Sequence, residues 1–184
     1  MSQFRLEVDL GYYPPKPSKR QLWSSLTLSL YLEANFFSSF SQARNNPFKS
    51  VSGVTARPDM ASKAVNDFIA KQVPHAKYIM TVCTGSWLLS GCGILDGKRA
   101  TTNKFTFNEV KSKTSPTIKW VPKARWVVDG NVWTSSGVTA GQDMALEFLK
   151  MIGGDGFATM AKNIIELRAA QADDDEFATV YNLI

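Results

Sequence analysis

The chain of 184 residues is 44% hydrophobic and 20% charged, which is typical of one globular domain with its own core. Its two cysteines lack a CxxC spacing and it has a single histidine, so the composition excludes a zinc site and a disulfide scaffold. We therefore expect one domain over residues 1–184, without a metal, in a reducing compartment.

The net charge of +5 is unevenly distributed along the chain. Eight lysines and arginines but only one acid lie between Lys98 and Arg125, whereas residues 172–184 are acidic. A basic run can mark a nucleic-acid surface, but this one has no recognised binding motif and only scattered aromatic residues. A solvated face or a field for an anionic substrate explains it better, so we expect no nucleic-acid partner. The acidic stretch is expected to be an exposed, loosely ordered tail.

The first 54 residues show neither a helical nor a strand period. The best candidates there are Phe4 to Val8 for a first strand and Leu22 to Phe37 for a helix. The start of the chain lacks the basic, apolar and small-residue order of a secretory signal. The uncharged stretch from Leu22 to Leu32 is far shorter than the roughly 20 residues of a membrane span. We therefore expect a soluble, cytoplasmic protein with no membrane partner.

An orderly pattern begins near residue 57. Apolar residues at helical spacing predict a helix within Asp59–Gln72, and Pro74 then stops it. The apolar run Tyr78–Val82 is typical of a strand in a parallel sheet that is covered on both faces. Gly85–Ser90 is predicted to be the next helix, closed by the glycines that follow it.

A hairpin and a long helix are predicted in the second half of the chain. The pair Asp129 and Gly130 lies between two β-type segments and indicates a tight hairpin. The segment SSGVTAGQDMALEFLKMIGG has one apolar face at helical spacing. Its helix is expected to begin with a capping box made by Thr139 and Gln142 and to end at Gly153 as a C-cap glycine.

A further helix is expected from Phe157, with four residues facing the core: Met160, Ala161, Ile164 and Leu167. No internal repeat is evident. Strands alternate with helices along the chain, so the fold class is α/β with a mostly parallel sheet and a small hairpin insert.

The segment TVCTG places Cys83 between a predicted strand and a predicted helix. A nucleophile at such a tight turn is lifted clear of the sheet, and the start of the helix stabilises a thiolate there. The N–H of Thr84 would then be an oxyanion donor, and Gly85 would let the backbone turn. A buried cysteine that only fills space at a strand end is equally consistent with this spacing. Cys92, between two glycines, is expected to be an ordinary thiol.

Two separated motifs carry a family resemblance. VCTGSWLLSGCGILDGKRATTN, followed by ARWVVDGNVWTSSGVTAGQDMALEFL, resembles the ThiJ/PfpI family of the class I glutamine amidotransferase-like superfamily. The most similar branch contains isonitrile hydratases and the sensor domains of AraC-type regulators. The resemblance covers about residues 56–178. It implies a flavodoxin-like three-layer sandwich, usually a homodimer, with a reactive cysteine at Cys83, Thr84 as the residue that binds substrate or oxyanion, and no metal or organic cofactor.

The chain departs from the family pattern at two places. The family segment that matches GKRATTN usually ends in His, whereas this chain has Asn103, and an amide cannot act as a general base. His75 is no replacement, because it should lie at the opposite end of the sheet from Cys83. Upstream, only Gly53 remains of a glycine loop that provides the other oxyanion donor, and Asp9 is the best counterpart of an acid that contacts the cysteine. The first 54 residues are therefore divergent, shortened or wrongly assembled from the gene.

Two classes of function follow from these observations. In the first, the protein is an enzyme in which Cys83 attacks an electrophilic carbon of a small molecule, N–H groups near Thr84 and Gly53 stabilise the developing charge, and water releases the product. Isonitrile hydration is the concrete example, and amide hydrolysis and glyoxal-type chemistry are the neighbouring options. In the second, the protein is a non-catalytic stress sensor, redox sensor or ligand-binding protein of the same fold.

Overall fold

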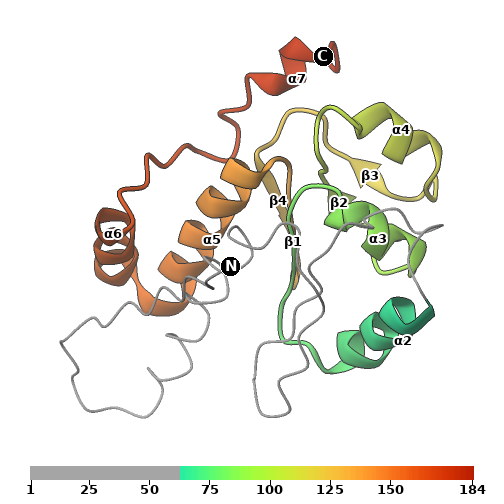
Figure 1. Ribbon diagram of the computed structural model, residues 1–184, viewed down its shortest axis with the longest axis horizontal. Helices are drawn as coiled ribbons and strands as arrows, with labels where there is room; N and C mark the ends of the chain where they lie inside the picture. Colours follow the sequence, from blue (N-terminus) through green and yellow to red (C-terminus); the bar gives the residue numbers. More distant parts are fainter. Residues whose placement is uncertain (1–62) are drawn as a thin grey trace, which may run out of the picture.

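The computed structural model describes residues 63–184 (Figure 1). The expected first strand, the expected helix near residue 30 and two predicted site residues, Asp9 and Gly53, lie outside the described residues. No helix in the described part is both long enough and apolar enough to cross a membrane.

The strands form two small sheets. The three-stranded sheet has the order β1-β5-β4, with β1 (Ile79–Thr81) parallel to β5 (Val132–Ser135) and β4 (Trp126–Asp129) antiparallel to it. The second sheet is a parallel pair, β2 (Arg99–Ala100) and β3 (Lys119–Trp120). The sheet structure is thus partly mixed. The predicted hairpin is confirmed, because Gly130 joins β4 to β5 with φ of +62°.

The helices lie on both sides of the strands, with α5 and α6 on one side and α2 and α3 on the other (Figure 1). Their bounds are α2 Lys63–Gln72, the 3-10 turn η2 Val73–His75, α3 Gly85–Gly91, α4 Phe107–Ser112, α5 Val138–Gly153, α6 Asp155–Ile164 and α7 Phe177–Val180. This arrangement fits the expected α/β class.

Strand β5 is buried on both faces and divides the core in two. Val132 packs with Ile69 of α2 and with Leu88 and Leu89 of α3, whereas its neighbour Trp133 packs with Trp126 and Met144 on the α5 side. Successive side chains of a strand point to opposite faces, so one short strand contributes to both apolar clusters. The run of buried residues through β5 follows from this position at the centre of its sheet.

The ends of α5 differ from the predicted ones. Gly137 is the N-cap and no side chain caps the helix, while Gly154, with φ of +82°, is the C-cap. The predicted capping box is wrong, because Thr139 lies inside the first turn and its hydroxyl accepts a hydrogen bond from the Arg125 guanidinium at 3.3 Å. Gly153 is the last helical residue, one position before the C-cap.

Helix α6 buries one of the residues predicted to face the core, Ala161, but not the larger apolar residues of that prediction. Its buried residues are Ala158 and Ala161, which pack against Leu149 of α5, whereas Met160 and Ile164 are 43% and 41% exposed. Small residues allow α6 to lie close to α5, so the larger apolar side chains are turned outward.

The acidic C-terminal segment is largely exposed, as expected, but two of its residues are buried against the rest of the described chain. Asp175 is 4% exposed and Ala178, in α7, is fully buried. The Arg125 N–H donates to the Ala172 carbonyl at 2.7 Å, which fastens the segment to the start of β4. The sequence did not predict this attachment, because acidic composition indicates solvent exposure only when the carboxylates lack buried partners, and Asp175 has one in Lys104.

Candidate active site

Cys83 occupies a sharp turn between β1 and α3. Its φ of +58° lies in the left-handed region, which side-chain-bearing residues seldom adopt. The Cys83 N–H donates to the Ser135 carbonyl at 3.1 Å, and the Cys83 carbonyl accepts from the hydroxyls of Ser86 at 3.1 Å and Thr102 at 3.3 Å. These three hydrogen bonds hold the residue in a conformation that costs about 1–2 kcal/mol.

The turn therefore falls on the cysteine itself and not on Gly85. Gly85 is the first residue of α3 and does not have a left-handed φ. A Cβ at this position would lie 3.4 Å from the Cβ of Thr81, so the glycine allows α3 to start close to β1. The sequence placed the strand, the cysteine and the helix in the right order, but it assigned the unusual backbone conformation to the wrong residue.

The groups around the thiol are consistent with a binding or reaction site. Cys83 is half-buried, and within residues 63–184 its Sγ has no hydrogen-bond partner. Thr84 is the N-cap of α3, and the described part of the chain provides no acceptor for its N–H. The thiol and this N–H belong to consecutive residues, which is the arrangement of a nucleophile elbow, where the N–H after the nucleophile stabilises developing charge.

Asn103 follows the residue that contacts the Cys83 carbonyl, but its own side chain has a local role. The Asn103 Oδ1 accepts the N–H of Phe105 at 3.0 Å, which is the Asx-turn arrangement. In the described residues it makes no hydrogen bond to Cys83. His75 lies in η2, before β1, whereas Cys83 follows β1, so the two residues lie at opposite ends of that strand.

Helix α5 packs directly against the residue that precedes the cysteine. A Cβ at Gly141 would lie 2.8 Å from Cγ1 of Val82, which is closer than side-chain carbons approach each other. The absence of a side chain at Gly141 thus sets the distance between α5 and the end of β1. The sequence analysis did not single out this glycine, since a glycine within a helix gives no sign of its contact partner.

The DJ-1/PfpI family matches residues 51–151, which is more than half of the chain and includes the whole strand-Cys83-helix turn. The chain belongs to this family. An isonitrile hydratase from Pseudomonas putida is 37% identical over 123 residues, which are 66% of this chain and 52% of the hydratase. The chain thus spans about half the length of that relative. The resemblance to the ThiJ/PfpI family is confirmed.

Solved structures support the same fold. An AraC family transcriptional regulator from Pseudomonas putida matches 80% of this chain and 91% of its own with a TM-score of 0.53, at 13% identity. A DJ-1 superfamily protein from Salmonella typhimurium matches 78% and 91% with a TM-score of 0.51, at 17% identity. At these identities the similarity concerns the fold, which is the flavodoxin-like α/β fold of DJ-1/PfpI proteins.

Two buried ion pairs in this DJ-1/PfpI chain were not predicted. Lys104 Nζ lies 3.1 Å from Asp175 Oδ2, and Arg125 Nη2 lies 2.6 Å from Asp143 Oδ2, with both aspartate side chains almost fully buried. The sequence does indicate that Asp143 needs a buried partner, because this acidic residue lies on the apolar face of α5 next to Met144. It gives no such indication for Lys104, since nothing near Lys104 in the sequence points to its distant partner.

The second cysteine of the DJ-1/PfpI chain has a different environment. Cys92 is the C-cap of α3, and its Sγ lies 3.9 Å from Oδ1 of Asn66 on α2. Burial raises the pKa of the Cys92 thiol, so a smaller share of it is the reactive thiolate at neutral pH than in a free cysteine.

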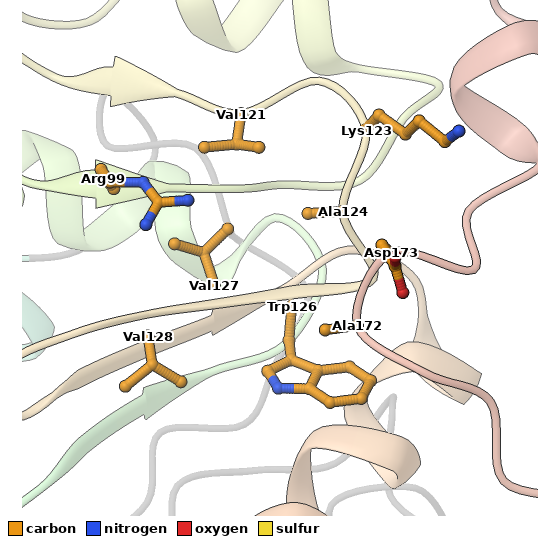
Figure 2. Close-up of a pocket in the computed structure, with 9 residues that line it drawn as sticks. All are labelled: Arg99, Val121, Lys123, Ala124, Trp126, Val127, Val128, Ala172 and Asp173. Atoms are coloured by element: carbon orange, nitrogen blue, oxygen red, sulfur yellow. The ribbon is translucent and has the colours of Figure 1, made fainter.

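A shallow pocket of about 270 Å³ lies along β4, away from these groups (Figure 2). Figure 2 shows the Trp126 indole next to Ala172 at one end and Arg99 with Val121 at the other. Its lining residues are Arg99, Val121, Lys123, Ala124, Trp126, Val127, Val128, Ala172 and Asp173. None of the predicted site residues lines it, so this pocket is separate from the turn at Cys83.

Proposed function

We propose that the protein is a cysteine-dependent enzyme that adds water to an electrophilic carbon of a small molecule. The observation that carries this proposal is the left-handed Cys83 between β1 and α3, with a half-buried thiol beside the N–H of Thr84. A strained residue held by three hydrogen bonds at a ligand-accessible strand end is a common feature of functional sites. The 37% identity to an isonitrile hydratase supports isonitriles as the substrate class.

The chemistry can be written with all atoms accounted for. The Cys83 thiolate adds to the terminal carbon of the isonitrile, and that carbon takes up a proton, which gives a thioimidate. Water then adds to the same carbon and one of its protons goes to the nitrogen. The thiolate leaves as the oxygen loses its other proton, which balances the proton taken up in the first step, and the product is an N-substituted formamide. The N–H of Thr84, together with Gly53 in the glycine-loop segment, would stabilise the negative charge that develops in these steps.

The test is hydration of a simple alkyl isonitrile by the whole 184-residue chain, with the formamide measured by mass spectrometry. We expect product with the wild-type protein and with Cys92→Ser, and none above background with Cys83→Ser. Equal turnover by Cys83→Ser, or a wild-type protein that is folded and inactive on isonitriles and simple amides, would contradict the proposal.

One observation favours a second function. The Asn103 amide is engaged with Phe105, and in residues 63–184 no imidazole or carboxylate bonds the Cys83 thiol. A thiol without a base suits a redox or ligand sensor better than a hydratase. Treatment with dilute hydrogen peroxide, followed by peptide mass spectrometry, tests this: a sensor oxidises selectively at Cys83 while Cys92 stays reduced.

The proposal includes a homodimer, as the family resemblance implies, and a cytoplasmic location, as the cysteine usage of the sequence favours. Light scattering of the purified chain measures its mass directly, and a monomer at all concentrations would remove this part of the proposal without affecting the chemistry at Cys83.

A further inference from the structure

Lys104 is a buried lysine whose ammonium group has a complete set of acceptors. Its Nζ donates to the Thr101 hydroxyl at 2.8 Å and to the Ala124 carbonyl at 2.9 Å, and it lies 3.1 Å from Asp175 Oδ2. Lys104 and Asp175 are each 4% exposed. An ammonium group has three protons to donate, and all three find an oxygen here.

Both carboxylate oxygens of Asp175 also accept hydrogen bonds from backbone N–H groups. Its Oδ2 also accepts the N–H of Ala124 at 3.0 Å, and its Oδ1 accepts the N–H of Phe177 at 3.2 Å. The carboxylate thus joins three segments: the stretch after β2 through Lys104, the turn before β4 through Ala124, and the start of α7. A buried ion pair adds little net stability compared with apolar residues of the same size, so its fixed geometry is the more informative property.

A continuous series of contacts leads from this pair to Cys83. The Thr101 hydroxyl that accepts from Lys104 donates to the Val121 carbonyl at 2.9 Å, and the Thr101 N–H donates to the Thr134 hydroxyl at 2.9 Å. These bonds fix the backbone immediately before Thr102. The Thr102 hydroxyl then donates to the carbonyl of Cys83, the residue with the left-handed backbone.

We propose that Lys104 and Asp175 are a positioning pair for Cys83, through which the C-terminal segment holds residues 101–104 against the turn. The pair does not touch the thiol. It keeps the Thr102 hydroxyl on the Cys83 carbonyl and so keeps the left-handed conformation that presents the thiol beside the N–H of Thr84. This inference rests on the proposed function, because it assigns Asp175 and Lys104 a part in the reactivity of the same cysteine.

The first experiment compares Asp175→Asn with Asp174→Asn, a neighbouring exposed aspartate without an ion pair among the described residues. The rate of alkylation by iodoacetamide is followed at Cys83 and at Cys92 by peptide mass spectrometry between pH 6 and 9. Displacement of a reacting group by about 1 Å can cost 10²-fold, so we expect Asp175→Asn to slow Cys83 by about tenfold or more and to alter its pH profile. Cys92 and the Asp174→Asn protein should react as in the wild type. An unchanged Cys83 profile in folded Asp175→Asn would overturn the proposal.

A second variant distinguishes a loss of positioning from a loss of folding. Lys104→Met with Asp175→Leu removes both buried charges, which is often neutral for stability, but it also removes the hydrogen bond from Lys104 to the Thr101 hydroxyl. We expect this double variant to unfold at a denaturant concentration close to that of the wild type. Its Cys83 should nevertheless be alkylated more slowly than in the wild type. Wild-type reactivity at Cys83 in the folded double variant would contradict a positioning role.

Hydrogen exchange separates this inference from the proposed function. If Cys83 of the wild type is inert to iodoacetamide, the enzyme proposal fails. Amide exchange of the peptide that contains Thr101 and Thr102 still reports on the pair. Faster exchange there in Asp175→Asn, but not in Asp174→Asn, supports the positioning of this segment, and equal exchange in the two variants excludes it.

Discussion

The two cysteines lie at opposite ends of the same seven-residue helix, α3, and their backbone conformations differ. Cys83 precedes the helix with φ of +58°, and Cys92 follows it as a C-cap with φ of −94°. The start of a helix favours a negative charge and its end disfavours one. Burial also raises the pKa of Cys92. Two residues of the same type therefore have different backbone conformations and different positions relative to the same helix.

The largest expected effect is the difference in reactivity between these cysteines. Burial raises the pKa of the Cys92 thiol, so at pH 7 a smaller share of Cys92 is the thiolate that attacks iodoacetamide. We expect iodoacetamide at pH 7 to label Cys83 at least about tenfold faster than Cys92. Urea-unfolded protein is the control, in which the two rates should converge. Equal rates in the folded protein would remove the contrast between the two helix ends.

The next effect concerns the packing that fixes the end of β1. Gly141→Ala places a methyl group 2.8 Å from Val82, and overpacking of this kind costs about 1–3 kcal/mol. We expect a lower free energy of unfolding and a slower Cys83, with Cys92 unaffected. Gly156→Ala in α6 is the matched control, because nothing lies within 4 Å of its Cβ and alanine favours a helix. If both alanine variants are equally stable, α5 does not constrain the turn.

A smaller effect is expected from the single hydroxyl that reaches the Cys83 carbonyl. Thr102→Val removes this hydrogen bond and keeps the side-chain shape, which costs about 1 kcal/mol and corresponds to roughly fivefold in the Cys83 alkylation rate. Ser90→Ala removes the bond from the Ser90 hydroxyl to the Trp87 carbonyl near the Cys92 end and should leave Cys83 unchanged. A fivefold slower Cys83 in Ser90→Ala as well would mean that α3 transmits the perturbation.

The smallest effect is the pH dependence of stability contributed by Lys104. Burial lowers the pKa of Lys104 from 10.5, against the opposing effect of Asp175, so at alkaline pH the unfolded chain binds more protons at this site than the folded chain. Stability therefore rises with pH as the pH increases toward 10.5, and the cost of burying the charge is fully present below the folded pKa. Denaturant midpoints between pH 8 and 10 should rise more in the wild type than in Lys104→Met with Asp175→Leu. A steeper rise in the double variant would contradict a lowered pKa for Lys104.

Sequence patterns were reliable where structure is local. Asp129 and Gly130 predicted the hairpin, because a tight turn needs a residue that tolerates positive φ. The apolar period of α5 and the order of strand, cysteine and helix were correct for the same reason: each depends on residues a few positions apart. The capping box at Thr139 failed, because a distant arginine took the threonine hydroxyl.

The sequence by itself determined the family, the α/β class and the cysteine at the turn, since motif order and periodicity are properties of neighbouring residues. Only the tertiary structure decided how that cysteine is held. The left-handed Cys83 depends on hydroxyl and amide partners from separate elements, and Lys104 meets Asp175 across most of the described chain. Such contacts are invisible in a single sequence, because buried polar groups are satisfied by whichever segments the fold brings together.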